Sequence, residues 1–181
     1  SQCYARTYGL PVAIARMGNI YGGGDLNWNR IVPGTIRSVF RGENPVIRSD
    51  GTPVRDYFYV EDAVDAYLAL AEGLASDKIE NGEAFNFSND LPMTVKQMCE
   101  WVIDATWKSM LADRLAKYGN HSYPLDIRNE ATGEIQAQHL SSLKARFVLG
   151  WEPRWSLADG LRETSKWYRD YFQVLEGHND E

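Results

Sequence analysis

The sequence is poor in cysteine and histidine, which argues against two common ways of stabilising a small protein. Its 181 residues include two cysteines and three histidines. Cys3 and Cys99 are far apart, and no two histidines have the spacing of a metal-binding pair. We therefore expect neither a disulfide framework nor a metal site. Two widely separated cysteines fit a protein of the reducing cytoplasm.

Two further absences limit the classes of function. No apolar run approaches the roughly 20 residues that a helix needs to cross a bilayer, and the first residues lack the apolar segment of a signal peptide. The formal net charge is −6, which argues against nucleic-acid binding, because that function needs a basic face. A small anionic ligand is still compatible with this charge, because a few well-placed arginines outweigh a weakly negative background at short range.

Familiar catalytic and nucleotide-binding motifs are also missing. No G-x-G-x-x-G or P-loop opens a helix, and none of the ten tyrosines is followed by a lysine four positions later. No Ser–His–Asp order stands out. Considered without any relative, the sequence indicates a phosphate-binding module that has no catalytic groups of its own.

What is present is an alternation of short apolar runs and amphipathic segments, which predicts a mixed α/β fold. The start of the chain resembles the middle of a helix, as if it had been cut from a longer protein. Strands are predicted at residues 11–16, 45–48, 54–60, 84–87 and near 125–127. Helices are predicted at residues 2–8, 29–41, 63–74, 94–109, 140–150 and 156–171.

A glycine-rich loop follows the first predicted strand. Residues 16–28 read R-M-G-N-I-Y-G-G-G-D-L-N-W. Sheets of α/β proteins bind ligands where their strands end, and glycine lets the backbone approach a phosphate. A purely structural turn explains the same glycines, so both interpretations stay open.

Arginines form the second candidate group, and a short polar segment forms the third. Arg55 lies within an apolar and aromatic strand, where a guanidinium needs an acidic partner or a ligand phosphate. An ion pair with Asp56 explains Arg55 as well as a phosphate contact does. The polar alternation of residues 134–139 fits a half-exposed strand as well as a binding segment. The arginines of the second group are Arg30, Arg37, Arg48 and Arg55.

Three segments, in this order along the chain, resemble motifs of the extended short-chain dehydrogenase/reductase family of NAD-dependent epimerases and dehydratases. Residues 16–22 resemble its R-x-x-N-x-Y-G motif, and residues 54–62 resemble its R-D-[YFW]-x-Y-V-x-D motif. Residues 149–153 resemble its L-G-W-x-P turn. The resemblance implies an α/β fold consisting of the C-terminal fragment of a Rossmann-type protein. Residues 1–181 would form its nucleotide-sugar-binding portion, with the last Rossmann elements near residues 1–28 and the N-terminal NAD-binding domain absent.

Within this family, residues 21–28 and 30–34 are similar to those of members that act on CDP-glucose. Most other members have Arg-Pro where this chain has Ala131-Thr132. The resemblance thus implies NAD-dependent 4,6-dehydration of CDP-glucose to CDP-4-keto-6-deoxyglucose, a lyase reaction of deoxysugar and O-antigen biosynthesis. Two alternatives stay open: another NAD-dependent nucleotide-sugar epimerase or dehydratase, and a non-catalytic sugar-nucleotide-binding module.

The resemblance also assigns roles to residues. It places Met17 and Gly18 near the nicotinamide of NAD, and it puts every catalytic residue upstream of Ser1, so that we expect the fragment alone to be inactive. It implies a homodimer whose helices this chain carries only in part, and apolar surface at residues 12–14 and 21–28 where the absent sheet would pack. The residues assigned to the nucleotide sugar are Asn19, Arg30, Ile31, Val46, Arg48, Arg55, Glu134 and Gln136.

Overall fold

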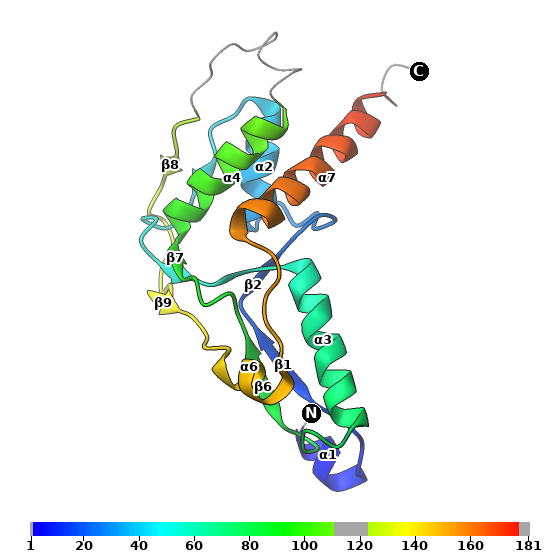
Figure 1. Cartoon of the computed structure of the whole chain (residues 1–181). Coiled ribbons are helices and arrows are strands. Elements are labelled where there is room, and N and C mark those ends of the chain that lie inside the picture. Colours follow the sequence, from blue (N-terminus) through cyan, green and yellow to red (C-terminus); the bar gives the residue numbers. More distant parts are fainter. Residues whose placement is uncertain (1, 111–122, 178–181) are drawn as a thin grey trace. The chain divides into compact units, whose positions relative to one another are not determined.

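The computed structural model describes residues 2–110 and 123–177, which form two compact units (Figure 1). Unit 1 contains the residues up to 20 together with 55–92 and 138–155. Unit 2 contains residues 21–54, 93–137 and those from 156 onward. Each unit is therefore assembled from three separate stretches of the chain.

Unit 1 has a parallel α/β arrangement. Strand β1 (Ile14–Met17) pairs in parallel with β6 (Ala84–Phe87), as expected for the edge of a Rossmann-type sheet. Helices α3 (Val60–Ala75) and α6 (Leu143–Leu149) pack against this pair. The remaining elements of this part of the chain are α1 (Gln2–Tyr8), β2 (Asn19–Tyr21) and β5 (Tyr57–Tyr59), and β2 pairs with β5.

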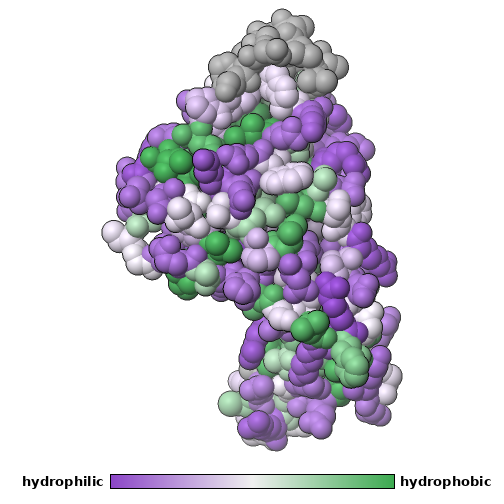
Figure 2. Space-filling view, turned by 60° about the vertical axis from the view of Figure 1, so that its left-hand side comes forward, coloured by the Kyte–Doolittle hydropathy of each residue, from purple (hydrophilic) through white to green (hydrophobic). Residues whose placement is uncertain are grey.

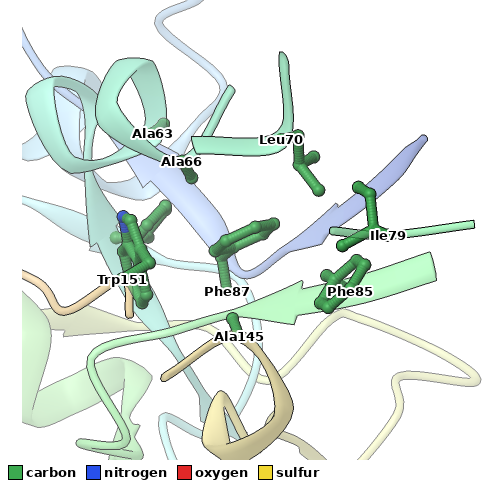
Figure 3. Packing of buried hydrophobic residues seen from close by; sticks show 9 residues of the cluster. Ala63, Ala66, Leu70, Ile79, Phe85, Phe87, Ala145 and Trp151 are labelled. Atoms are coloured by element: carbon green, nitrogen blue, oxygen red, sulfur yellow. The ribbon is translucent and has the colours of Figure 1, made fainter. Parts of the chain in front are cut away.

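The core of unit 1 is aromatic. Phe87 and Phe85 point from β6 into a cluster with α3 on one side and α6 on the other (Figure 3). The Trp151 ring meets Phe87 edge-on at 5.0 Å between centroids and Phe58 at 5.7 Å. Alanines at the facing positions of both helices let them approach the strands closely.

Local signals predict the first helix of unit 1 well and the strand at residues 54–60 poorly. Helix α1 ends at Tyr8, and Gly9 has the left-handed φ of +63° that favours glycine after a helix. The single strand predicted at 54–60 is instead two strands, β4 (Val54–Arg55) and β5. The break comes at Asp56, whose Oδ2 accepts a hydrogen bond from the backbone N–H of Leu140 at 2.5 Å.

Helix α3 buries a different face from the one that its large apolar residues mark. Its buried positions include Ala63, Ala66 and Leu70. Tyr67 and Leu68, which the sequence marks as apolar positions of the helix, are 59% and 55% exposed. The two alanines allow close contact with the strands and Leu70 completes the buried face, whereas Tyr67 and Leu68 are left on the outer face.

Unit 2 is a layer of helices with short strand pairs. Helices α2 (Ile31–Arg41), α4 (Val95–Ser109) and α7 (Leu157–Gly177) pack against one another (Figure 1). Thr94 and Gln97 form a capping box at the start of α4. Strand β3 (Val46–Ile47) pairs in parallel with β8 (Asp126–Ile127), which confirms a strand near residues 125–127. Strands β7 (Met93–Thr94), β4 and β9 (Ala137–Gln138), the last two at points where the chain passes from one unit to the other, form a three-stranded sheet in the order β7-β4-β9.

The apolar surface expected at residues 21–28 is only partly there. Tyr21 is 3% exposed, and Trp28 packs against aromatic residues of α7. Leu26 is exposed as expected. On the face drawn in Figure 2, hydrophobic residues form small groups among hydrophilic ones. No helix among the described residues is long and apolar enough to span a membrane.

Candidate functional site

The glycine-rich loop of unit 2 lies tightly against helix α7. A Cβ atom on Gly23 would come within 2.4 Å of Cγ of Trp167, which is closer than real Cβ atoms approach. Gly24 has a φ of +86°, in the left-handed region. Trp28 stacks on Phe172 of α7, with ring centroids 5.9 Å apart. The structure thus gives a packing reason for these glycines.

This loop tethers two of the predicted arginines. Arg30 Nη1 donates to Oδ2 of Asp25 at 3.2 Å. Arg48 Nη2 donates to Oδ1 of Asn29 at 2.8 Å. The Arg30 side chain is 60% exposed, and Arg48 is exposed as well. Arg30 and Arg48 are 18 positions apart in sequence, yet both are linked to residues 25–29. Their charged groups lie at the surface.

The loop itself is held by local hydrogen bonds between residues two positions apart and by one hydrogen bond from helix α7. The backbone N–H of Asn27 donates to Oδ1 of Asp25 at 3.0 Å, and that of Asn29 donates to Oδ1 of Asn27 at 3.2 Å. The Tyr168 hydroxyl donates to the backbone carbonyl of Asp25 at 2.6 Å. Burial and the nearby Asp25 carboxylate raise the pKa of Tyr168 well above its usual value, so the phenol keeps the proton that it donates in this hydrogen bond.

Two apolar residues predicted to contact the nucleotide belong to the same unit. Ile31 begins α2 and packs partly against the small core of Ile47, Val95 and Cys99. Val46 lies in β3 and is 37% exposed. Burial raises the pKa of the Cys99 thiol to about 11, so this cysteine is an inert packing residue.

The segment around Glu134 and Gln136 belongs to unit 2 and makes backbone hydrogen bonds there. The carbonyl of Gln136 accepts from the N–H of Val54 at 2.8 Å. Upstream of it, the N–H groups of Glu130 and Ala131 donate to the carbonyl of Arg48 at 2.7 and 3.1 Å. Gln136 is exposed and Glu134 half-buried. The half-exposed strand predicted at 134–139 forms only at β9, whose two residues are both exposed.

The other predicted residues, Met17, Gly18, Asn19 and Arg55, belong to unit 1. A Cβ atom on Gly18 would lie 2.8 Å from Cβ of Asp56, and the Asn19 N–H donates to the Asp56 carbonyl at 2.8 Å. Gly18 is therefore required by contact with the chain itself. Asn19 is exposed, and Arg55 is half-buried in β4. Their roles toward a ligand stay predictions.

Sequence reasoning missed the residues that hold the arginines in place. Asp25, Asn27 and Asn29 alternate along the chain, and this spacing is typical of side chains that bond to the backbone two residues later. That local signal could have identified them. Tyr168 has no such signal, because it lies 143 positions from Asp25.

Two negative results concern the described part of the chain. No group of three or more His, Cys, Asp or Glu side chains there could hold a metal ion. A groove of about 580 Å³ in unit 2 is lined by Lys96, Trp107 and Leu125, among others, and includes none of the predicted ligand-binding residues.

Comparison with known proteins bears out the family resemblance. Residues 1–87 match the NAD dependent epimerase/dehydratase family. The chain is 31% identical over 176 residues to dTDP-glucose 4,6-dehydratase of Haemophilus influenzae, covering 92% of this chain and 47% of that protein. It is 27% identical over 173 residues to CDP-glucose 4,6-dehydratase of Salmonella typhimurium, covering 92% and 43%.

Solved structures give the same answer for the fold. UDP-glucose 4-epimerase of Thermotoga maritima, solved with UDP-glucose, superposes with a TM-score of 0.74 at 28% identity. The match covers 94% of this chain and 50% of that structure. The Rossmann-type α/β class expected from the sequence is confirmed. The chain spans about half the length of the relatives that it matches.

Proposed function

We propose that this chain recognises the nucleotide sugar in an NAD-dependent 4,6-dehydratase, with CDP-glucose as the substrate. The observation that supports this most directly is the surface group in unit 2, where Arg30 and Arg48 are tethered to one short loop. Guanidinium groups suit phosphate oxygens because their fixed fork of donors makes paired, charge-assisted hydrogen bonds. Both arginines use only some of these donors within the chain.

The choice of CDP rests on sequence. It is supported by the loop at residues 21–28 and by Ala131-Thr132 in place of Arg-Pro. A dTDP-sugar is the second candidate, because the dTDP-glucose relative is 31% identical to this chain and the CDP-glucose relative 27%. Identity at this level does not separate the two nucleotides, so the experiment has to.

The residues present fit NAD only at one edge. Met17 ends the parallel strand β1 and Gly18 follows it, and ligands of α/β sheets bind beyond the carboxyl ends of such strands. The close contact with Asp56 already explains why residue 18 is a glycine, so this glycine is not evidence of space for a cofactor. We propose that Met17 and Gly18 border the cofactor and that polypeptide outside these 181 residues binds its pyrophosphate and supplies the catalytic groups. When bound, NAD would accept the hydride from C4 of the sugar and return it to C6.

The test uses the protein encoded by the complete reading frame that contains this chain. Calorimetry with CDP-, dTDP-, UDP- and GDP-glucose should give at least tenfold tighter binding for CDP-glucose. NMR of the reaction with CDP-glucose and NAD should show a 4-keto-6-deoxy sugar. An in-frame dinucleotide fingerprint and a Y-x-x-x-K motif ahead of Ser1 are expected in the same reading frame.

A matched pair of variants tests the residues in the proposal. Arg48→Met should weaken binding by roughly 1.5–3 kcal/mol, the range for hydrogen bonds to charged groups. Arg162→Met is the control, because Arg162 is an exposed arginine of α7 paired with Asp159. A preference for dTDP-glucose would replace the CDP assignment, and failure to bind any nucleotide sugar would contradict the proposed function as a whole.

A further inference from the structure

Arg30 and Arg48, the two arginines that we propose bind phosphate, are both connected to the same buried hydroxyl. The Tyr168 hydroxyl bonds the Asp25 carbonyl, and the Asp25 carboxylate bonds Arg30. From Asp25 the series continues through Asn27 to Asn29, which accepts from Arg48. A continuous path of hydrogen bonds and loop backbone thus joins helix α7 to the two exposed guanidinium groups.

The buried end of this path is tightly packed. Tyr168 is fully buried, and its ring meets Trp28 at 6.0 Å and Trp167 at 5.0 Å between centroids. Trp28 is the residue between Asn27 and Asn29. Its packing against Tyr168 therefore holds the part of the loop from which Asn29 contacts Arg48. Gly23, pressed against Trp167, fixes the other end of the loop.

At the exposed end of the path, each guanidinium group is held by one nitrogen and keeps other donors for a ligand. Arg30 uses Nη1 and Arg48 uses Nη2 for their tethers, and each guanidinium has five N–H donors in total. A long arginine side chain otherwise loses much of its freedom when it binds. Tethering one nitrogen in advance reduces that loss and leaves further donors for an anion.

We propose that Tyr168 is a positioning residue for nucleotide-diphosphate binding: it anchors the loop of residues 25–29, which holds Arg30 and Arg48 in the orientation that receives the phosphates. This inference rests on the proposed function and adds to it a residue that touches no ligand. It predicts that loss of one buried hydroxyl affects phosphate recognition selectively. The base and sugar of a nucleotide should be recognised as before.

The experiment compares Tyr168→Phe with Tyr171→Phe in the complete protein. Both remove one hydroxyl from α7, but Tyr171 stacks on Trp167 and is not part of the path. Affinities are measured for CDP against cytidine and for dTDP against thymidine. Amide hydrogen exchange at Asn27 and Asn29 reports on the loop without any ligand. Asp25→Asn, which weakens the Arg30 contact from the exposed side, is a second variant that leaves the α7 core intact.

We expect Tyr168→Phe to speed exchange at both amides and to weaken diphosphate binding about fivefold to tenfold, with nucleoside binding unchanged. Asp25→Asn should give the same selective loss, and Tyr171→Phe should give neither effect. Faster exchange with unchanged diphosphate affinity would overturn the positioning role alone, as would equal weakening of diphosphate and nucleoside. A wild-type protein that binds neither diphosphate would overturn the proposed function, and the positioning role with it.

Discussion

Polar side chains at two sites, one in each unit, differ in how far they are buried. In unit 1 the polar groups that organise loops are buried: Asp62 and Ser142 are both 0% exposed. The Asp62 carboxylate accepts from the backbone N–H of Arg154 at 2.7 Å, and the Ser142 hydroxyl donates to Asp90 at 2.5 Å. At the loop of unit 2 the charged side chains are more open: that of Asp25 is 25% exposed and that of Arg30 60%, while Tyr168, which anchors the loop, is buried.

This difference separates groups that maintain the fold from groups that are available to a ligand. A buried polar group must be satisfied within the protein, because leaving it without a partner costs about 1–3 kcal/mol. An exposed group pays no such cost and can exchange water for a ligand. Asp62 and Ser142 in unit 1 therefore maintain the fold, whereas the exposed guanidinium of Arg30 in unit 2 is available to a ligand.

The largest expected effect comes from the aromatic core of unit 1. Phe87→Ala removes a fully buried ring that packs edge-on against Trp151, and it should lower the free energy of unfolding by about 3–5 kcal/mol. Urea denaturation followed by circular dichroism measures this. Phe147→Ala is the control, since Phe147 is 92% exposed, and it should change stability by less than about 0.5 kcal/mol. Equal effects of the two variants would contradict the described core.

The next effect tests the packing explanation of the glycine loop in unit 2. Gly23→Ala places a methyl group against the Trp167 ring and should cost about 1–3 kcal/mol, the range for overpacking. In a double-mutant cycle, Trp167→Ala should relieve most of this cost, because the clash disappears with the ring. Additive effects of the two substitutions would mean that the glycine serves some purpose other than contact with α7.

The sequence predicts the fold best where the determinants are local. The end of α1 at Gly9 and the capping box at Thr94 each depend on residues within one helical turn. The break at Asp56 depends on Leu140, which lies 84 positions away, so the periodicity of residues 54–60 predicts one strand where there are two. The same applies to α3, whose buried face is chosen by how closely it approaches β1 and β6.

The candidate site divides in the same way. Arg30 and Arg48 are found from the sequence by residue type and family resemblance, and their tethers Asp25 and Asn29 carry a local signal. Nothing near these residues in sequence points to Tyr168, because its contact with Asp25 exists only once α7 has packed against the loop. Anchoring residues of this kind are a property of tertiary structure.

The smallest expected effect concerns one carboxylate in each unit, because their pKa values are shifted in opposite directions. Burial raises the pKa of Asp62 in unit 1, whereas hydrogen bonds from the backbone and side chain of Thr52 lower the pKa of Asp50 in unit 2. The folded protein therefore holds a proton on Asp62 more tightly than the unfolded chain does. Asp62 stabilises the fold fully only below its ordinary pKa of 3.8, and this contribution is lost as pH rises through the raised value. Asp50 contributes above its ordinary pKa and loses its contribution as pH falls through the lowered one.

Asp62→Asn and Asp50→Asn should therefore change the pH dependence of stability in opposite directions. Relative to wild type, Asp62→Asn should gain stability as pH rises from 3.8 toward neutrality, because its amide still accepts from Arg154 and carries no charge to bury. Asp50→Asn should instead lose stability relative to wild type over the rise in pH up to 3.8. Urea denaturation of the three proteins at a series of pH values gives both differences, and subtracting wild type cancels the carboxylates that they share. Differences of the same sign would show that the buried and exposed carboxylates are not distinguished by their surroundings, and the contrast drawn between the two units would then fail at these positions.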